Sequence, residues 1–482
     1  MDYSLASIPK ELYVRGAWRP AHDGARLAVI DPATEQTIAQ VADAGVSDAL
    51  DAVDAAAAAG PAWAARPPRE RGEILRRAFE LIIWHRDAIA RLITLESGKA
   101  LAGAQAEATY AAEFLRWYSE ESVRAQGEIG TVPSGANRMI ILRQPIGVCV
   151  FITPWNFPAA MATRKIGPAL AAGCTVVLKP AKETPLTALA MASLFEEAGV
   201  PPGVINVLPS QQSSKIVAHM LRDARVRKLS FTGSTQVGRV LLAQAADRIV
   251  KCSMELGGNA PFLVFADADL EAAVASAMVA KLRNGGESCT AANRFYVQAP
   301  VAEEFACRFA ETMAAVKIGP GLDDGVQMGP LVNAATRDKV AELVADARDR
   351  GGRVLTGGRM PARAGFFYEP TVIDRLPTDA RAFHHEIFGP MAPIASFESV
   401  DEAVALANDT EFGLVSFVHT RDLAKALAVA ERIESGMVGI NRGVVSDPAA
   451  PFGGWKQSGI GREGAHDGLL EYLETKYIAA SW

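Results

Sequence analysis

The chain has 482 residues, 49% of them hydrophobic, and its 49 basic and 55 acidic side chains give a net charge of −6. This length predicts about three domains with several buried cores, and the acidic balance argues against a basic stripe for nucleic-acid binding. The most apolar long stretch, residues 146–162, contains two prolines and an asparagine, which disfavours a membrane span. The N-terminus has no basic segment followed by an apolar one, so we expect no secretory signal.

The cysteines form neither a disulfide pattern nor a metal-binding pattern. Their number is odd and no two have CxxC spacing. We therefore expect a reducing compartment and a cytoplasmic location. Composition alone does not say which of them is reactive. They are Cys149, Cys174, Cys252, Cys289 and Cys307.

The first 125 residues are expected to be mostly helical. An alanine-rich helix at residues 48–60 is expected to end at a Gly-Pro pair. Residues 69–96 carry apolar side chains at helical spacing before a glycine that is suited to end a helix. Residues 100–124 predict a further helix. Residues 128–144 have extended patterns around a Pro-Ser-Gly turn, which indicates a β excursion.

From residue 146 onward, short β-branched segments alternate with helices. Helices are expected at residues 158–172 and 185–198, each followed by a glycine. The alternation predicts βαβ units with a parallel sheet, which is typical of nucleotide-binding proteins, although a fold alone does not establish function. The expected strands are residues 147–153, 175–179, 204–208, 228–232 and 249–253.

A second alternating region begins near residue 267 and predicts another α/β domain. Its tail, residues 451–464, is rich in loop-forming residues, and residues 472–479 are suited to an edge strand. The expected helices are residues 270–281, 301–317, 400–408 and 423–434. The expected strands are residues 294–298, 353–356, 414–419 and 437–441.

Two residues near glycine pairs are candidates for catalysis. Cys289 comes shortly after Gly285 and Gly286, where the backbone can approach a ligand closely and a thiolate can act as a nucleophile. Glu255 ends an expected strand just before two glycines, where a carboxylate can act as a general base. Taken alone, each has a simpler interpretation: a small buried thiol and a glutamate that caps a backbone amide.

The expected parallel sheet places two further segments at its ligand-binding edge. Residues 153–158 follow the first strand, and Asn156 is suited either to donate an N–H to an oxyanion or to cap a proline-fixed turn. Residues 231–238 are a glycine-containing strand-to-helix turn whose amides are suited to a pyrophosphate. This second segment is neither GxGxxG nor a P-loop, so taken alone it is weak evidence.

Two charged segments have alternative interpretations. Lys179 and Lys182 follow the second strand and are suited to ribose hydroxyls or an extra phosphate, or form an ordinary solvated turn. The run His384-His385-Glu386 has no HExxH spacing and no cysteine partners. We therefore expect no metal site.

Taken together, several motifs resemble those of the aldehyde dehydrogenase superfamily, in the same order and across essentially the whole chain. Glu255 and Cys289 are 34 residues apart, which agrees with the spacing of base and nucleophile in that family. The motifs are PWNFP at 154–158, ELGG at 255–258, GGESC at 285–289, HEIFGP at 385–390 and PFGGWKQSGIGRE at 451–463.

The resemblance implies a reaction and a role for each catalytic residue. Cys289 would attack an aldehyde carbonyl, and the Asn156 side chain with the Cys289 backbone N–H would hold the oxyanion. Hydride would pass to the nicotinamide of NAD(P), and Glu255 would activate a water that hydrolyses the thioester. Lys165 and Glu463 match family positions connected with proton handling and organisation of the site.

The resemblance also implies a dinucleotide site. NAD-preferring members often carry a glutamate three residues after the lysine that matches Lys179, and this chain has Lys182 there. A cation at that position should tolerate a 2′-phosphate, so we expect NADP to be accepted and leave open whether NADP or NAD is preferred. The residues expected near the dinucleotide are Ile152, Thr153, Pro154, Trp155, Lys179, Gly233 and Ser234, with Leu256, Glu386 and Phe388 near its nicotinamide half.

Within the superfamily, the chain is most similar to the succinate-semialdehyde dehydrogenase subfamily. That subfamily holds the distal carboxylate of its substrate with two arginines and a serine, which correspond here to Arg164, Arg283 and Ser446. The alternative for either arginine is an ion pair with a carboxylate of the protein. Asp447 is a departure, because its charge could repel an acidic substrate or orient an arginine. Ala291 replaces the second cysteine of some members, so we expect no redox switch.

The leading interpretation is therefore NAD(P)-dependent oxidation of an acid semialdehyde, with succinate semialdehyde first among the substrates. Glutarate semialdehyde, 2-oxoglutarate semialdehyde and aromatic aldehydes are alternatives within the family. A non-enzymatic binding relative would not need Cys289, Glu255 and Asn156 together. A cysteine hydrolase is disfavoured because no histidine lies near Cys289 in the sequence.

The resemblance implies two Rossmann-type α/β domains and a small β oligomerisation excursion. We expect a homodimer or homotetramer that acts on a small aldehyde, without nucleic-acid or membrane partners. The expected boundaries are residues 1–125 and 146–257 for the dinucleotide-binding domain, 258–457 for the catalytic domain, and 126–145 with 458–482 for the oligomerisation segment.

Overall fold

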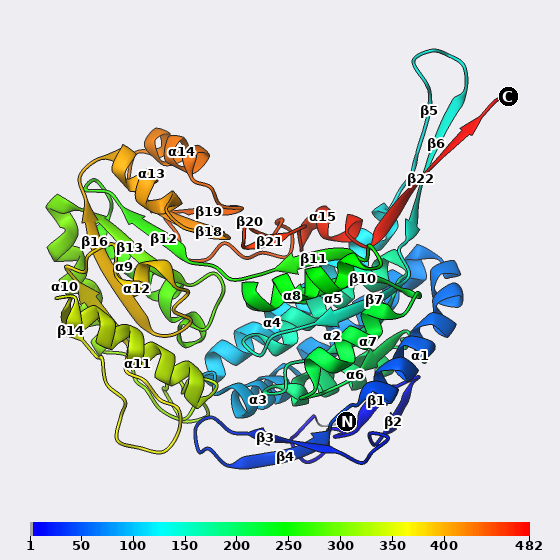
Figure 1. Cartoon of the computed structure of the whole chain (residues 1–482), viewed down its shortest axis with the longest axis horizontal. Helices are drawn as coiled ribbons and strands as arrows, with labels where there is room; N and C mark the ends of the chain where they lie inside the picture. The colour runs from blue at the N-terminus through cyan, green and yellow to red at the C-terminus, as the bar shows by residue number, and fades with distance from the viewer. Residues whose placement is uncertain (1–2) are drawn as a thin grey trace.

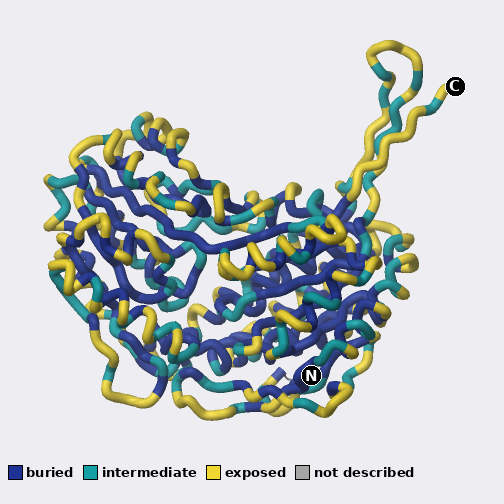
Figure 2. The backbone as a smooth tube through the Cα atoms, in the orientation of Figure 1, coloured by how far each residue is buried: buried dark blue, intermediate teal, exposed yellow. Residues whose placement is uncertain are grey.

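The computed structural model describes residues 3–482, which form two large α/β units and a narrow β arm that projects from them (Figure 1). Each unit contains a mostly parallel sheet with helices packed on it. The buried residues follow the strands of both sheets, whereas the arm is mostly exposed (Figure 2). Among residues 3–482, no helix has the length and apolar character needed to cross a membrane.

The first sheet has the strand order β2-β1-β9-β8-β7-β10-β11-β21, and β9 to β11 are parallel to one another. Every residue of β7 and β8 is buried, as expected for parallel strands that helices cover on both faces. The strands are β1 (Leu12–Val14), β2 (Ala17–Arg19), β7 (Val148–Ile152), β8 (Thr175–Lys179), β9 (Ile205–Val207), β10 (Val226–Thr232), β11 (Lys251–Glu255) and β21 (Gly459–Ile460).

Helices and one short 3₁₀ turn accompany this part of the fold. The helix α5, which follows the first central strand, is buried along its whole length because it lies between the sheet and α2 and α4. The helices are α1 (Val46–Ala65), α2 (Pro68–Trp84), α3 (Arg86–Ser97), α4 (Leu101–Glu121), α5 (Pro158–Ala172), α6 (Pro185–Glu197), α7 (Ser213–Arg222) and α8 (Thr235–Ala246). The 3₁₀ turn is η1 (Ser122–Arg124), and a further 3₁₀ turn, η2 (Arg283–Gly286), lies in the second unit just before Cys289.

The five predicted parallel strands are present, but the N-terminal region differs from its mostly helical prediction. Besides β1 and β2, the strands β3 (Arg26–Ile30) and β4 (Thr37–Ala42) form a hairpin. The helix α1 continues through Pro61 and ends only at Arg66, because Trp63 packs in the core with 1% exposure. The helix predicted at residues 69–96 divides at His85, which leaves helical backbone angles without any proline or glycine to signal it.

The second sheet has the order β14-β15-β16-β13-β12-β18-β19 and is parallel except at β14. The sequence did not predict β12, β15, β16 or α11. The strands are β12 (Ala260–Val264), β13 (Ala292–Gln298), β14 (Arg353–Thr356), β15 (Thr371–Asp374), β16 (Met391–Phe397), β18 (Val415–His419) and β19 (Met437–Ile440). The helices are α9 (Leu270–Leu282), α10 (Ala299–Ala314), α11 (Ala334–Asp349), α12 (Arg381–His384), α13 (Val400–Asn408) and α14 (Leu423–Arg432).

The arm is a three-stranded sheet that combines the β excursion with the C-terminal strand. β6 (Arg138–Pro145) lies between β5 (Glu128–Thr131) and β22 (Leu473–Ala480), and all pairs are antiparallel. The predicted strand at residues 472–479 is therefore confirmed. The C-terminal tail also contributes β21 to the first sheet, the helix α15 (Ala465–Leu470), and β20 (Trp455–Lys456), which pairs with β17 (Phe412–Gly413) of the second unit.

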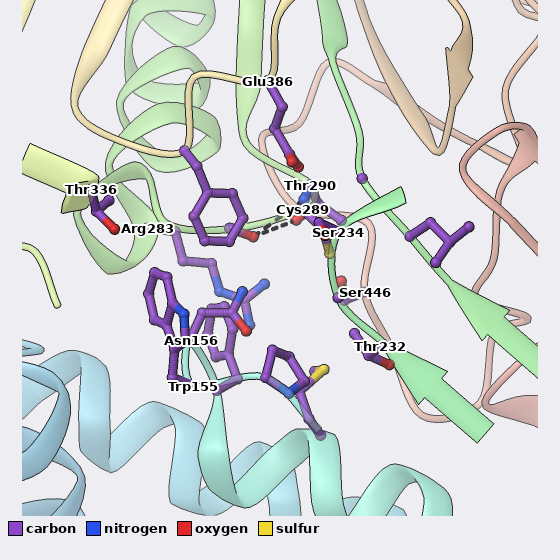
Figure 3. Close-up of a pocket in the computed structure, with 18 of the residues that line it drawn as sticks. Trp155, Asn156, Thr232, Ser234, Arg283, Cys289, Thr290, Thr336, Glu386 and Ser446 are labelled. Carbon is purple, nitrogen blue, oxygen red and sulfur yellow. Dashed lines mark hydrogen bonds between the residues drawn. The ribbon is translucent and has the colours of Figure 1, made fainter. Parts of the chain in front are cut away.

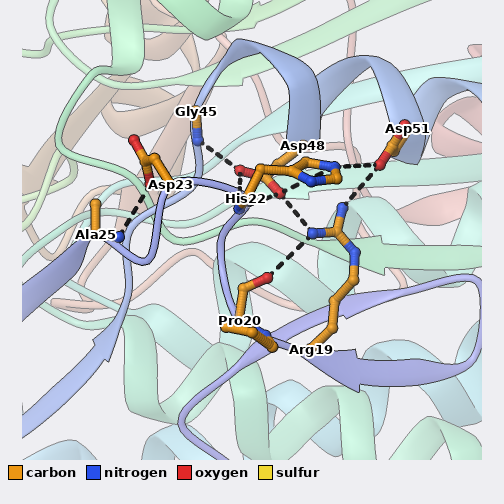
Figure 4. Close-up of polar contacts among 8 residues, drawn as sticks. All are labelled: Arg19, Pro20, His22, Asp23, Ala25, Gly45, Asp48 and Asp51. Atoms are coloured by element: carbon orange, nitrogen blue, oxygen red, sulfur yellow. Dashed lines mark hydrogen bonds and ion pairs between the residues drawn. The ribbon is translucent and has the colours of Figure 1, made fainter.

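A polar cluster fastens the β1–β2 hairpin to the start of α1 (Figure 4). Asp48 is buried, and its carboxylate accepts the N–H groups of Gly45 at 2.9 Å and His22 at 3.2 Å. Arg19 donates to both Asp48 at 2.6 Å and Asp51 at 3.1 Å. Because one carboxylate caps the helix and binds the hairpin, the N-terminal strands are held against the sheet.

The buried ring of His419, at the end of β18, predicts a pH dependence of stability. The ring stacks on Phe262 with centroids 4.4 Å apart, and burial lowers its pKa to about 4. Between pH 6.5 and 4 the unfolded chain therefore binds a proton that the folded chain excludes. We expect this residue to cost up to about 3 kcal/mol of stability as the pH falls through that range.

Urea unfolding at pH 7 and pH 4.5 measures this effect. We expect His419→Phe to lose less stability between the two pH values than the wild type loses. His384→Phe, the same exchange at an exposed position, is the control. Equal pH slopes for the His419 variant and the wild type would show that the ring is not excluded from protonation in the folded state.

Candidate active site

A cavity of about 410 Å³ lies where the two units meet, and it contains most of the predicted site (Figure 3). Its walls come from the ends of β7, β10 and β11, the start of α11, and loops on either side. Among the predicted residues, those that line it are Pro154, Trp155, Asn156, Arg164, Gly233, Ser234, Leu256, Arg283, Cys289, Glu386, Phe388 and Ser446. Those outside its wall are Ile152, Thr153, Lys165, Lys179, Lys182, Glu255 and Glu463.

The loop that presents Cys289, residues 283–290, is shaped by left-handed backbone. Asn284, Gly285 and Gly286 have φ angles of 54°, 61° and 83°. A Cβ on Gly286 would lie 2.2 Å from the Gly389 carbonyl oxygen, so this position needs glycine for space as well as for conformation. The glycines of the motif therefore shape the loop that brings Cys289 into the cavity.

Asn156 lies on the turn at residues 153–158, between β7 and α5, and it faces the Cys289 loop. Its Nδ2 donates to the Glu287 carbonyl at 3.1 Å, which leaves the second N–H of the amide available. Within residues 3–482, the backbone N–H of Cys289 donates to no protein acceptor. The cavity thus has two free N–H donors next to the thiol, the arrangement that an oxyanion requires.

The thiol of Cys289 is protonated in the ligand-free protein. Burial raises its pKa to about 12, and the charges of Glu255 and Glu386 act in the same direction. The guanidinium groups of Arg164 and Arg283 act against this and favour the thiolate. The positive charge of the cavity therefore opposes a large desolvation cost, and the thiol must lose its proton before or during attack.

A buried charge network lies behind the cavity wall. Lys165 Nζ donates to Glu463 Oε1 at 2.5 Å and to Ser230 Oγ at 2.9 Å. Burial raises the pKa of Glu255 well above its usual range, and the charge of Glu463 adds to this. Burial also favours the neutral form of Glu463, but the positive charges of Lys165 and Arg164 have the larger effect and lower the pKa of that carboxyl. Glu463 is therefore ionised, whereas burial favours the neutral form of Glu255, so Glu255 can act as a base only after it has lost its proton.

The two predicted substrate arginines have different partners. Arg164 donates to the Tyr110 hydroxyl at 2.8 Å, and it lies 3.5 Å from the Glu463 carboxylate. Arg164 therefore pairs with a carboxylate of the protein, which was the alternative to its role in substrate binding. The Arg283 guanidinium lies over the Phe157 ring at 4.9 Å and forms no ion pair within residues 3–482. Asp447 is exposed and does not line the cavity, so it neither faces a ligand there nor orients an arginine.

The predicted dinucleotide residues fit such a ligand at the cavity end of β10. Ser234 caps α8 by accepting the Val237 N–H at 3.4 Å, and the start of that helix opens on the cavity. The Thr232 hydroxyl lines the cavity, is buried, and has no protein hydrogen-bond partner within residues 3–482. A helix start and an unsatisfied hydroxyl are groups that a phosphate and its sugar can satisfy.

Lys179 ends β8 beside Ile152 of β7, Lys182 follows it, and neither lysine lines the cavity. Lys179 is buried, and burial lowers its pKa to about 8, with Glu183 and Asp43 opposing the shift and Lys182 adding to it. Lys182 is exposed. Ile152 and Thr153 are buried at the end of β7.

Sequence reasoning missed two cavity residues of chemical interest. Tyr110 is an isolated tyrosine in α4, and no local signal separates it from a core residue. Lys339 lies on α11, which was not predicted; burial lowers its pKa, and Glu386 and Glu287 oppose the shift. No group of three potential metal ligands is found among residues 3–482.

Comparisons with known proteins point to the same family as the sequence motifs. Residues 18–478 match the family model described as the aldehyde dehydrogenase family. A succinate-semialdehyde dehydrogenase from Paenarthrobacter nicotinovorans is 52% identical over 92% of this chain and 98% of that protein. A glutarate-semialdehyde dehydrogenase from Pseudomonas aeruginosa is 49% identical over 97% of each chain. The crystal structure of an E. coli NADP-dependent enzyme superposes with a TM-score of 0.97 at 47% identity, over 98% of each chain.

The raised pKa of Cys289 predicts slow alkylation in the ligand-free protein. We expect iodoacetamide to modify Cys289 at pH 8 roughly a hundredfold or more slowly than an accessible thiol, with the rate rising about tenfold per pH unit up to pH 10. Cys307, which is exposed on α10, is an internal reference in the same sample. Peptide mass spectrometry measures both rates, and similar rates at pH 8 would contradict the prediction.

Proposed function

The chain belongs to the aldehyde dehydrogenase family, and from that premise we propose that it oxidises succinate semialdehyde to succinate with NAD(P). The observation that carries the proposal is the cavity itself. It places Cys289 and Asn156 together with Arg283, a guanidinium that has no carboxylate partner within residues 3–482. Arg164, the other arginine of the cavity, is paired with Glu463, so Arg283 suits a substrate that carries its own carboxylate.

Substrate binding uses both ends of the aldehyde. The distal carboxylate meets Arg283 and the Ser446 hydroxyl, both of which line the cavity. Tyr110, held by Arg164, contributes a further hydroxyl at the same wall. These contacts place the carbonyl carbon at Cys289, so that attack becomes effectively unimolecular.

Nucleophilic attack then uses the groups around Cys289. Cys289 releases its proton to water as the Sγ–C bond forms, and the carbonyl oxygen becomes an oxyanion that accepts the second N–H of Asn156 and the Cys289 backbone N–H. When bound, the nicotinamide supplies a hydride acceptor, so that loss of hydride from this carbon gives a thioester on Cys289. Trp155, Glu386 and Phe388 line the side of the cavity where we place that ring, and Lys339 adds a positive charge near Glu386.

Hydrolysis of the thioester requires a base, and Glu255 suits this role. Its Oε2 is buried without a protein hydrogen-bond partner within residues 3–482, so that side of the carboxyl is not held in place. Glu255 takes a proton from water, the resulting hydroxide adds to the thioester carbonyl, and Cys289 leaves as the thiolate. Lys165 and Glu463 fix the charge around Glu255 and thereby its protonation.

Glutarate semialdehyde is the second candidate substrate. It is favoured by the 49% identity to a glutarate-semialdehyde dehydrogenase. It carries the same two end groups as succinate semialdehyde, with one more methylene between them. A single methylene changes discrimination by only about 1–3 kcal/mol in a hydrophobic pocket, so one enzyme can accept both.

The proposal extends to assembly and location. The arm formed by β5, β6 and β22 exposes several large apolar side chains, which suits it to dock on another copy of the chain in a dimer or tetramer. The five free cysteines suit the reducing cytoplasm. The exposed apolar residues of the arm are Ile129, Leu142, Tyr477, Ile478 and Trp482.

Arg283→Met tests the role of the free guanidinium. We expect kcat/KM for succinate semialdehyde to fall about 10- to 100-fold more than kcat/KM for butanal, because only the semialdehyde loses a charge-assisted hydrogen bond, whereas both substrates lose the effect of Arg283 on the Cys289 thiolate. Arg164→Met should impair both substrates, because it also leaves Glu463 without one of its cations. NAD(P)H formation at 340 nm measures these values. Equal losses on the charged and uncharged aldehydes in the Arg283 variant would refute the carboxylate contact.

Lys182→Glu tests the cofactor site. We expect KM for NADP to rise about 10- to 100-fold, because a carboxylate repels the 2′-phosphate, while KM for NAD is unchanged or lower. Lys215→Glu, the same exchange at an exposed position on α7, is the control. Equal changes in KM for the two cofactors would show that Lys182 does not face the 2′-position.

A further inference from the structure

A fully buried ion pair lies beside the turn that carries Asn156. Lys99 follows the left-handed Gly98 at the end of α3, and Glu107 is in α4. The two side chains are 2% and 0% exposed, and Lys99 Nζ contacts Glu107 Oε2. Such a pair costs desolvation energy that its mutual attraction repays only with good geometry and further hydrogen bonds. The remaining contacts of the pair therefore indicate what it does.

Those remaining contacts go to both sides of the turn. Lys99 Nζ donates to the Asn156 carbonyl oxygen at 2.9 Å and lies 4.0 Å from the centroid of the Phe157 ring. Glu107 Oε1 accepts the N–H groups of Ala159 at 3.0 Å and Ala160 at 3.5 Å, in the first turn of α5. The pair thus fixes the Asn156 backbone at one end and the start of α5 at the other.

Asn284 ties the same turn to the Cys289 loop. Its Nδ2 donates to the Asn156 carbonyl oxygen at 3.0 Å and to the Glu287 carbonyl oxygen at 3.1 Å. The Asn156 side chain donates to that same Glu287 carbonyl at 3.1 Å. These bonds form a closed ring in which each of the two carbonyls accepts two donors.

We propose that Lys99 and Asn284 are positioning residues, which set the Asn156 amide relative to the Cys289 thiol by holding the Asn156 carbonyl between them. Neither side chain lines the cavity, so neither touches the substrate. The inference rests on the proposed role of Asn156 as an oxyanion donor. Because catalysis depends on where that amide lies to within about 1 Å, loss of either bond should lower kcat while substrate binding changes little.

Asn284→Gly is the most selective variant. Asn284 has a φ of 54°, which glycine adopts without strain, so the exchange removes the amide and keeps the backbone. Asn441→Gly is the matched control, because Asn441 also has a left-handed φ, of 53°, and its side chain also bonds to backbone, but outside the cavity wall. We expect Asn284→Gly to lower kcat about tenfold with KM changed less than threefold, and Asn441→Gly to leave kcat unchanged.

Lys99 is tested together with Glu107, because Lys99→Met alone would leave a buried carboxylate without its cation. The double variant Lys99→Met/Glu107→Gln removes both charges. Lys228→Met is the control for loss of a buried lysine, since Lys228 bonds to Ser253 and Glu471 and not to the turn. We expect kcat to fall in the double variant and to persist in the control, with thermal melting confirming that both are folded.

A double-mutant cycle with Asn156→Ala distinguishes positioning from a general loss of structure. If Asn284 acts through Asn156, then Asn284→Gly should lower kcat less than twofold in an enzyme that already carries Asn156→Ala. Equal, additive losses in both backgrounds would overturn the inference, as would a wild-type kcat in Asn284→Gly. The cycle is run with whichever aldehyde the wild type oxidises best. Inactivity on acid semialdehydes therefore refutes the proposed substrate and leaves this test intact.

Discussion

The hydrogen bond from the Asn156 amide to the Glu287 carbonyl joins the two α/β units at the centre of the site. Asn156 belongs to the first unit, at the end of β7, and Glu287 belongs to the loop that precedes β13 in the second. The thiol and both proposed oxyanion donors lie within a few residues of one of these two. The relative placement of the units therefore determines the relative placement of thiol and oxyanion donors, and small shifts between them would affect catalysis more than binding.

The N-termini of α5 and α8 have different partners. The helix α5 begins two residues after Asn156, and its first free N–H groups already donate to the buried carboxylate of Glu107. The start of α8, by contrast, opens on the cavity with only the Ser234 hydroxyl as its cap. Glu107 thus supplies an anion at the start of α5, whereas the start of α8 is suited to the phosphates of the proposed cofactor. Such a helix start can serve a dinucleotide in a chain without GxGxxG.

The sequence predicted the parts of the fold that local pattern controls. The buried β-branched strands of the first sheet and the glycine-flanked Cys289 loop were found because burial on both faces and left-handed backbone each restrict residue type. The break at His85, the continuation of α1 through Pro61, and the strands β12, β15 and β16 were missed because tertiary packing decides them. The same holds for Tyr110, Lys339 and the Lys99–Glu107 pair, whose roles depend on contacts between residues far apart in the sequence. The motifs identified the groups that we propose to react, whereas the residues proposed to hold those groups in place carried no local signal.

The charges that act in the cavity come from individual nearby side chains and not from the net charge of the chain. With a net charge of −6 the protein as a whole does not attract an anion, so the field at the site must come from a few buried cations. Lys99 and Lys165 are neutralised by Glu107 and Glu463, and Arg164 is shared between Tyr110 and Glu463. Among the cations that line the cavity, Arg283 and Lys339 have no ion-pair partner within residues 3–482. Burial raises the pKa of the Cys289 thiol, and Arg283 opposes that rise. Arg283 therefore has two effects at once: it favours the thiolate at Cys289, and it favours a substrate that carries a negative charge.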